Sequence, residues 1–169
     1  MDEDLKKSIV KAKYLWDTAR HGAMATVNAN GSPHNTPFRF MRDPDLKYIY
    51  WASYPEAVHS QNILRTGKIF LVLYDTNEVQ KGGLYISAEE GHALEGEKLV
   101  KALAINNDLR AKEGKNKLTP EYYSGGTAQK MWSAKITHFW VNCAKRDVNG
   151  QINKDSRQEV RVADLMNQN

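Results

Sequence analysis

Hydrophobic residues recur with the period of a helix in three parts of the chain. Residues 3–20 carry apolar side chains at steps of three and four, and Gly22 is a natural C-terminal cap. A short second helix is predicted to follow Ser53, a candidate N-cap, and to end at Gly67. Residues 96–114 again have helical spacing. Helices are therefore expected at these three places, and the hydrophobic pattern between them has the shorter period of strands.

Between these helices the apolar residues alternate or form short runs typical of strands. The Asn30-Gly31 pair predicts a tight hairpin, because it supplies the positive φ angles that such a turn demands. Pro33 and Pro37 indicate an edge or bulged second strand. Strands are expected in the hairpin within residues 23–41 and in segments at 46–53, 68–75, 84–96, 134–144 and 158–165, and about six of them are expected to form the barrel.

The order of these segments predicts the fold class. Strands that follow one another through hairpins, rather than alternating with long helices, favour an antiparallel barrel over a parallel sheet. The expected fold is α+β, mainly antiparallel β, with a six-stranded barrel and flanking helices. A length of 169 residues fits one domain over residues 1–169, large enough to bury a core of its own.

Composition and charge exclude several classes of protein. Cys143 is the only cysteine, so zinc fingers and disulfide frameworks are excluded and the residue is expected to be buried. The N-terminus starts acidic and no apolar run approaches the ~18 residues of a membrane span, which predicts a cytoplasmic protein. The net charge of +4 is spread along the chain and suits a small phosphorylated ligand as well as nucleic acid.

Motifs for common enzymatic chemistries are absent from the sequence. There is no GxGxxG turn, no phosphate-binding GxxxxGK[ST] loop and no GxSxG elbow. The five histidines include no HExxH and no paired ligand spacing. Hydrolytic and metal-dependent chemistry is therefore unsupported.

The junction between the third strand and the second helix carries the clearest chemical signal. Here Ala52 and Ser53 leave room for a phosphate to approach the backbone, and a helix N-terminus presents unpaired N–H groups. Ser53 either donates to that phosphate or only caps the helix. His59, Asn62 and Thr66 share one helix face and either line a polar site or lie in solvent.

This order of segments resembles the FMN-binding split barrel of the pyridoxamine 5'-phosphate oxidase-like family. The resemblance rests on HGAMATVNANGSPHNTPFRF, LKYIYWAS, AVHSQNI and KIFLVLYD, and it covers about residues 10–100. It implies a homodimer that binds FMN between its chains. The cofactor-binding residues that it implies are Thr36, Pro37, Phe38, Arg39, Trp51, Ala52, Ser53, His59, Ser60, Asn62 and Trp140.

Each group of these residues has an implied role. The strand over Thr36–Phe40 would lie along the flavin ring, Ala52 and Ser53 would contact the flavin and its phosphate, and His59 takes the place of a cation beside that phosphate. Trp140 would reach the flavin of the second subunit, or is simply a core aromatic residue.

Two departures from the family pattern narrow the expected activity. Pro37 stands where the family oxidases hold the phosphate with an arginine, and the stretch 146–150 keeps only Arg146 of the family's Arg-x-His-x-Arg cluster. Oxidation of pyridoxamine phosphate itself is therefore not expected.

The sequence predicts an FMN-dependent oxidoreductase that acts on an unidentified small molecule, with no residue assigned as a catalytic acid or base. The first alternative is the same fold with deazaflavin F420 or haem as its ligand. The second is a non-enzymatic small barrel that binds single-stranded nucleic acid by stacking.

Overall fold

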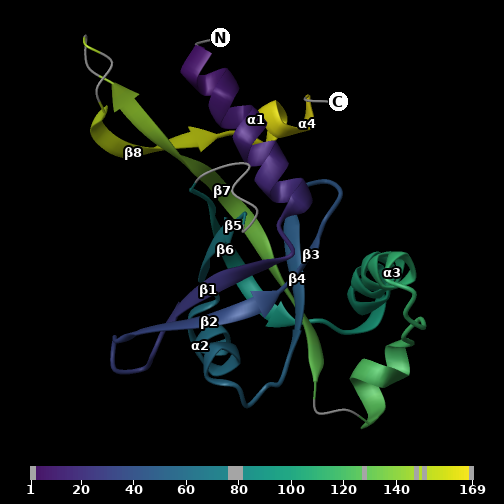
Figure 1. Ribbon diagram of the computed structural model, residues 1–169. Helices are drawn as coiled ribbons and strands as arrows, with labels where there is room; N and C mark the ends of the chain where they lie inside the picture. The colour runs from purple at the N-terminus through teal and green to yellow at the C-terminus, as the bar shows by residue number, and fades with distance from the viewer. Residues whose placement is uncertain (1–2, 76–81, 127–128, 147–148, 150–151, 168–169) are drawn as a thin grey trace.

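The computed structural model describes residues 3–75, 82–126, 129–146, 149 and 152–167. Helices and strands follow one another in an α+β arrangement (Figure 1). The helical elements are α1 (Glu3–Thr18), α2 (Val58–Thr66), α3 (Gly96–Lys112), the π-helical turn η1 (Tyr122–Gly126) and α4 (Val162–Met166). The strands are β1 (His21–Val27), β2 (Pro33–Arg39), β3 (Met41–Arg42), β4 (Tyr48–Ser53), β5 (Ile69–Tyr74), β6 (Gly83–Ala93), β7 (Lys130–Arg146) and β8 (Ile152–Val160).

The strands form one antiparallel sheet that curls into a half-open barrel. Their order is β2-β1-β5-β6-β7-β4-β3, and β8 pairs with the C-terminal half of β7. The two ends of this order approach each other without a ladder between β2 and β4, which leaves the barrel split along that line (Figure 1). The predicted class, α+β and mainly antiparallel, is confirmed, and so is the split barrel.

The predicted number of six strands is wrong, because the sheet has eight in the part of the chain that the structure describes. The two-residue strand β3 is too short to leave a hydrophobic pattern. The segment predicted at 158–165 is divided: β8 ends at Val160 and the remainder forms α4. The strand predicted at 134–144 is the middle of the 17-residue strand β7.

The first hairpin uses a different turn from the predicted one. The β1–β2 loop closes through Asn28 N–H to Ser32 O at 2.9 Å and Gly31 N–H to Asn28 O at 2.9 Å. Gly31 has a φ of 82°, whereas Asn30 is not among the described residues with positive φ. The loop is therefore longer than a two-residue turn, and only its glycine needs the left-handed conformation.

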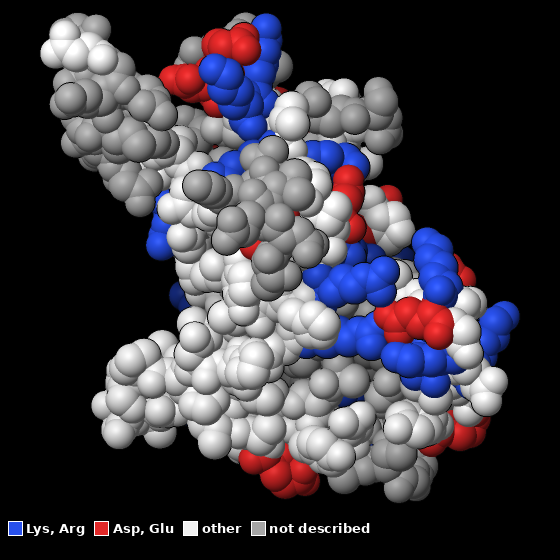
Figure 2. All heavy atoms as spheres, viewed as in Figure 1, with Lys and Arg blue, Asp and Glu red and all other residues white. Residues whose placement is uncertain are grey.

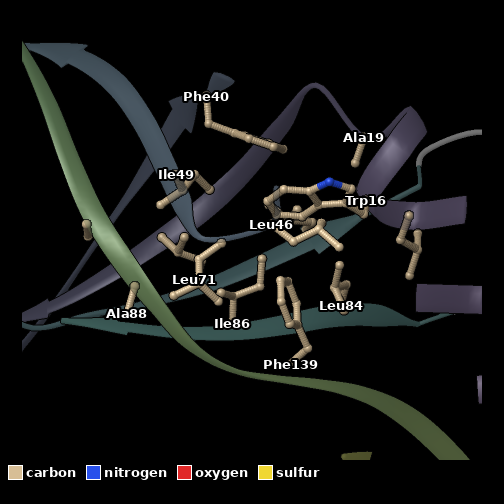
Figure 3. Packing of buried hydrophobic residues seen from close by; sticks show 14 of the residues in the cluster. Trp16, Ala19, Phe40, Leu46, Ile49, Leu71, Leu84, Ile86, Ala88 and Phe139 are labelled. Atoms are coloured by element: carbon tan, nitrogen blue, oxygen red, sulfur yellow. The ribbon is translucent and has the colours of Figure 1, made fainter. Parts of the chain in front are cut away.

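Helix α1 closes one end of the half-barrel. Its apolar face buries Ile9, Leu15 and Trp16 against the inner face of the sheet, where the Trp16 and Phe139 rings meet edge to face at 5.5 Å (Figure 3). A second, smaller cluster lies on the other face of β4, where Leu99 and Leu103 of α3 are buried. Helix α3 is thus attached to the outside of the barrel by a core of its own.

Helix α2 starts later than predicted and is fixed at its C-terminal end. It begins at Val58, and its N-cap residue Ala57 makes no side-chain cap. Its C-cap Gly67 has a φ of 67° and accepts a hydrogen bond from Gly91 N–H of β6 at 2.9 Å. A Cβ on Gly91 would lie 2.5 Å from Ile63 Cγ2, so this close approach requires glycine.

Among the described residues, no helix combines the length and the apolar character that crossing a membrane requires.

Candidate functional site

A cleft of about 320 Å³ lies in the split between β2 and β4. Its base is formed by the two strands, and residues of α2, α3 and η1 close its sides. It brings together most of the predicted cofactor-binding residues, which come from β2, β4 and α2. These residues are Pro37, Phe38, Arg39, Trp51, Ala52, Ser53 and His59.

Aromatic rings form one wall of the cleft. Phe38 and Phe40 lie side by side with ring centroids 5.4 Å apart, and Trp51 stacks on Trp132 at 6.4 Å. The indole N–H of Trp132 donates to Ser53 O at 3.2 Å, whereas Nε1 of Trp51 is buried without a hydrogen-bond partner. Phe38 is half-buried and offers apolar surface to a planar ligand, whereas Phe40 and Trp51 belong to the buried core.

The polar end of the cleft is built around Ser53. Its Oγ lies 2.6 Å from Nε2 of His59 and accepts a hydrogen bond from Ser60 Oγ at 3.3 Å. Burial, with a smaller effect of nearby His34, lowers the pKa of His59, so the imidazole is neutral near pH 7 in this state. The side chain of Ser53 is turned toward His59, which lies on α2.

The prediction that Ser53 caps α2 is wrong. The helix starts five residues later, after a turn closed by Ala57 N–H to Tyr54 O at 3.1 Å. The first backbone N–H groups of α2 therefore have no side-chain acceptor, and they lie beside His59. Such an end attracts anions because its free donors and the helix dipole act together.

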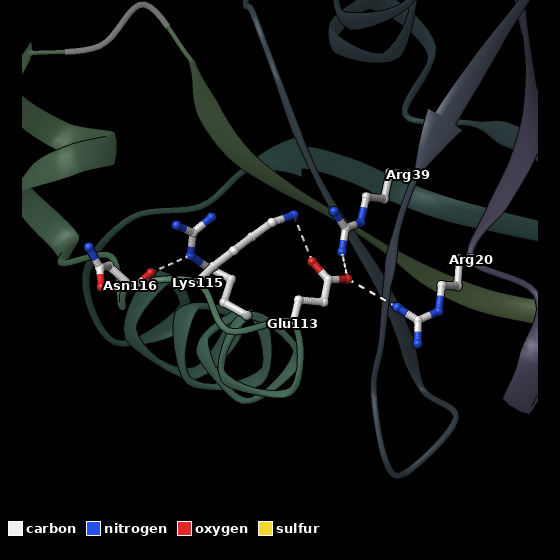
Figure 4. A network of polar contacts seen from close by, with 6 residues as sticks. Arg20, Arg39, Glu113, Lys115 and Asn116 are labelled. Atoms are coloured by element: carbon white, nitrogen blue, oxygen red, sulfur yellow. Dashed lines mark hydrogen bonds and ion pairs between the residues drawn. The ribbon is translucent and has the colours of Figure 1, made fainter.

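Arg39, which lines the cleft, belongs to a network of charged side chains (Figure 4). Glu113, just after α3, accepts from Arg39 of β2, from Arg20 at 3.0 Å and from Lys115 at 2.8 Å. The hydrogen bond from Lys115 is the main reason why the pKa of Glu113 lies below its usual range, despite partial burial. This ion-pair network ties the end of α3 to β2.

The distribution of charge differs between the two sides of the molecule. Lys, Arg and acidic side chains gather over α3, whereas the surface over α2 and the β1–β2 hairpin is largely uncharged in this view (Figure 2). The cleft lies between these two surfaces. A ligand bound there would meet fixed charge on the α3 side and neutral polar groups on the α2 side.

The remaining predicted residues lie outside the cleft. Thr36 is half-buried on β2, and Ser60 reaches the cleft only through Ser53. Asn62 donates to Thr26 Oγ1 at 3.1 Å and to Asn28 Oδ1 at 2.9 Å, so it fastens α2 to the β1–β2 hairpin.

Trp140 is placed on the outer face of the sheet. Its ring stacks on His138 at 5.1 Å and lies 6.2 Å from the ring of Phe70. Nearby, the guanidinium of Arg157 covers the ring of Tyr85 at 3.8 Å. Trp140 is half-buried in this aromatic cluster, so it is neither a core residue nor part of its own chain's cleft.

The sequence did not indicate that α3 would cover the cleft. The helix was predicted, but no local pattern says which part of a barrel a later helix will lie against. The lining residues that were missed are Met41, Asn106, Leu109, Arg110 and Tyr123. The side chain of Arg146 and residues 147, 148 and 150, which were compared with the family's substrate-binding cluster, lie outside the described part of the structure.

The fold is shared with several solved structures of low sequence identity. A haem-binding protein from Mycobacterium smegmatis superposes with a TM-score of 0.60 at 14% identity; the match covers 93% of this chain and 59% of that one. The haem storage protein HutZ from Vibrio cholerae gives a TM-score of 0.57 at 14% identity, over 78% and 92%. An F420 reductase gives 0.53 at 15%, over 75% and 94%.

The sequence itself places the chain in a family. No curated protein matches it. The sequence profile described as pyridoxamine 5'-phosphate oxidase (PNPOx_N) matches residues 10–143, which is most of the chain and includes every element that lines the cleft. With its split barrel and its cleft between β2 and β4, the chain belongs to the pyridoxamine 5'-phosphate oxidase family.

Proposed function

We propose that the protein binds FMN in the cleft between β2 and β4, as a homodimer, and acts as a flavin-dependent oxidoreductase on a small molecule. One observation carries the proposal: an aromatic wall and a phosphate-sized polar end occur in one cleft. The wall holds Phe38, Phe40 and Trp51, and the polar end holds Ser53 and His59 beside the uncapped start of α2.

The polar end fits a phosphate group through neutral donors. Ser53 Oγ and the first N–H groups of α2 can donate to phosphate oxygens, while the fully buried Ser60 Oγ donates to Ser53 and holds it in place. His59 adds a positive charge once a phosphate dianion raises its depressed pKa. Pro37 supplies no cation here, so phosphate binding is expected to be weaker than in a site with a fixed arginine.

The other end fits a flavin ring. Strand β2 pairs only with β1, so its outer edge leaves backbone groups near Phe38 free to bond the polar edge of a ring. When bound, FMN supplies hydride or electron transfer at its N5 atom. Arg39 and Arg110 line this part of the cleft and would favour negative charge on the reduced ring.

A second copy of the chain would complete the site. The cleft alone is near the lower limit for small-molecule pockets and would leave much of FMN in water. The outer aromatic cluster, with half-exposed Phe70, Tyr85 and Trp140, is the kind of surface that homodimers bury. We propose that this cluster, defined here as Phe70, Tyr85, His138, Trp140 and Arg157, forms the dimer contact.

F420 or haem is the second candidate ligand. The absence of a fixed cation at Pro37 weakens the argument for FMN in particular, and structures of this fold include a haem-binding protein and an F420 reductase. Nucleic-acid binding has less support, because positive and negative side chains are mixed over α3 rather than forming a basic stripe (Figure 2).

The visible spectrum of the purified protein, followed by titration of the apo protein, tests the proposal. FMN, F420 and haem absorb at different wavelengths, and FMN fluorescence is expected to change on binding. A double variant, Ser53→Ala with His59→Gln, should bind FMN much more weakly than a control with Ser32→Ala and His21→Gln in the exposed β1–β2 region. A colourless protein that does not respond to FMN would refute the FMN proposal, and equal affinities of the two variants would refute the phosphate assignment.

The dimer proposal is tested separately by light scattering during size-exclusion chromatography. Wild-type protein is expected to elute with the mass of two chains. Trp140→Ser should shift the mass toward one chain and weaken FMN binding at the same time. A wild-type monomer that still binds FMN would refute the shared site while leaving the cleft assignment intact.

A further inference from the structure

A second cavity, of about 430 Å³, lies beside the cleft, between the C-terminal half of α2, the start of α3 and η1. It is larger than the cleft and shares one lining residue with it, Tyr123. Its floor is closed by the buried apolar side chains of Leu94, Leu99 and Trp132. The proposed flavin contacts use none of the residues around this cavity.

The apolar surface that a ligand can reach in this cavity lies on its sides. Leu64 of α2 lines the cavity and is 57% exposed, whereas its neighbour Ile63 is fully buried in the core. Pro55 and Ala93 are half-buried and line the cavity as well. An apolar ligand placed here would remove this accessible surface from water, which is the main source of affinity in small-molecule sites.

Lys130, the first residue of β7, brings a positive charge to the cavity. Its side chain is half-buried, and its Nζ donates to Tyr123 O of η1 at 3.0 Å. An ammonium group has three donors, and this partner is a neutral carbonyl. The charge of Lys130 and its other N–H bonds therefore remain available to an anion in the cavity.

Among the residues that line the cavity, Glu95 carries a negative charge. It is exposed at the N-terminal end of α3, where its side chain makes no cap. Water and salt screen an exposed carboxylate more strongly than a half-buried ammonium group. Glu95 is therefore expected to weaken the attraction of Lys130 for an anion without cancelling it.

We propose that this cavity binds a monocarboxylic acid with an apolar body about as large as a phenylethyl group. The carboxylate of the ligand accepts hydrogen bonds from Nζ of Lys130, and the apolar body packs against Leu64, Pro55 and Ala93. A hydrogen bond between two charged groups is roughly twice as strong as a neutral one, so the acid is preferred over a neutral ligand of the same shape. The volume lies near the lower end for small-molecule pockets, which suits a ligand of this size. The inference is independent of the flavin proposal, because it uses different residues.

Isothermal titration of the protein with three related probes tests this inference. The acid 3-phenylpropanoate carries both the charge and the apolar body, 3-phenylpropanamide has the same shape without the charge, and acetate has the charge without the body. We expect the acid to bind best, the amide to bind at least about tenfold more weakly, and acetate not to bind. The absence of binding by 3-phenylpropanoate at millimolar concentration, or an equal affinity for the amide or for acetate, would overturn the proposal.

Variants assign the charge recognition to Lys130. Lys130→Met keeps an unbranched side chain without its charge, and it should weaken binding of 3-phenylpropanoate by at least about tenfold, to the level of the amide. Lys130→Arg keeps the charge and should keep most of the affinity. The matched control is Lys135→Met on the same strand, which removes a lysine whose Nζ pairs with Glu90 at 3.4 Å. This control should bind like the wild type.

Two further variants test the rest of the cavity. Leu64→Ser should weaken the binding of acid and amide alike, because it removes apolar surface that both of them use. Glu95→Gln should strengthen the binding of the acid alone, by a few-fold at low salt, because it removes the repelling charge.

The variants also provide the contrary outcome. If Lys130→Met remains folded and binds 3-phenylpropanoate as tightly as the Lys135→Met control does, the acid does not lie at Lys130 and the proposal fails. If Lys130→Met does not fold, the exposed positions decide: the changes expected for Leu64→Ser and Glu95→Gln would support the proposal, and unchanged affinity for the acid in both variants would overturn it.

Discussion

Two arginines that are three residues apart, Arg39 and Arg42, differ in almost every physical respect. Arg39 is half exposed at the end of β2 and pairs with Glu113 in a network that also includes Arg20 and Lys115 (Figure 4). Arg42 is largely buried beside α1, over the ring of Phe40, and two of its donor atoms have no partner.

The difference separates the roles of the two side chains. An exposed ion pair contributes little to stability, because water solvates both charges almost as well as they solvate each other. A buried guanidinium without an acceptor reduces stability, and its contact with the ring of Phe40 offsets only part of that cost. The ion pair of Arg39 is therefore expected to add little to stability, whereas the unpaired donors of Arg42 are expected to lower it.

Truncation of Phe40, whose ring lies between the cleft and Arg42, should have the largest effect on stability. Phe40 is 2% exposed; it lines the cleft and supports the guanidinium of Arg42. Phe40→Ala is expected to lower the free energy of unfolding by about 3 to 5 kcal/mol, measured by urea denaturation. Phe38 is more exposed, so Phe38→Ala should lower the free energy of unfolding by a clearly smaller amount. Equal losses would show that Phe40 is not the common support of both regions.

Replacement of each arginine in turn should show that Arg39 and Arg42 contribute differently to stability. Arg42→Met is expected to raise the free energy of unfolding by about 1 kcal/mol in the absence of ligand, because the relief of buried donors exceeds the loss of the contact with Phe40. Arg39→Met should leave it nearly unchanged. The same urea experiment measures both variants. A destabilised Arg42→Met variant would mean that the buried guanidinium supports the fold, contrary to the comparison.

A change of pH should alter the affinity for FMN, and this effect is expected to be smaller. His59 has a lowered pKa in the free protein, and a phosphate dianion favours its protonated form. The affinity for FMN should therefore rise as the pH falls from about 8 to about 6.5, by at most about tenfold per pH unit. Fluorescence titrations with FMN, and with riboflavin as the control without phosphate, measure this slope. His59→Lys should abolish it, and an equal slope for riboflavin would exclude the phosphate as its cause.

Acid is expected to lower the stability of the free protein, which is opposite in sign to its effect on the affinity for FMN. Because the pKa of His59 in the folded protein lies below the unfolded value, the unfolded chain binds more protons in acid. Its contribution to stability is present above about pH 6.5 and is lost as the pH falls through the folded pKa. Acid should thus weaken the free protein while it strengthens phosphate binding.

The smallest effect is expected from Glu113→Gln. This change releases Arg39 from its ion pair without altering the size of the side chain at 113. Stability should hardly change, whereas the affinity for FMN should rise a few-fold, because Arg39 becomes available to the ring. Lys115→Met serves as the control, since it removes one partner of Glu113 but leaves Arg39 paired. Unchanged affinity in Glu113→Gln would remove Arg39 from the proposed site.

The sequence predicted the parts of the fold that depend on local pattern. Amphipathic spacing identified α1 and α3, and the Asn30-Gly31 pair identified the first hairpin, although not its type of turn. The two-residue strand β3 is too short to show any period, and it exists only because β4 lies beside it. Similarly, the change from β8 to α4 at Arg161 is not marked by a proline or glycine.

The candidate site was predicted as far as it lies on neighbouring segments. Ser53 and His59 are six residues apart and meet through one turn, so their proximity could be inferred from the strand-to-helix junction. Arg110 and Tyr123 reach the cleft only because α3 packs on the outside of β4 through Leu99 and Leu103. That contact depends on tertiary packing, which no local spacing specifies.

The unequal ends of α2 have a consequence for how quickly the site exchanges with solvent. The C-terminal end is held by backbone hydrogen bonds at Gly67 and Gly91, whereas the first turn, next to His59, has no side-chain cap. Amide deuterium uptake should therefore begin at the first turn and advance toward Gly67. A bound anion would slow uptake in that first turn alone, so the exchange rates along α2 give a residue-by-residue record of occupancy.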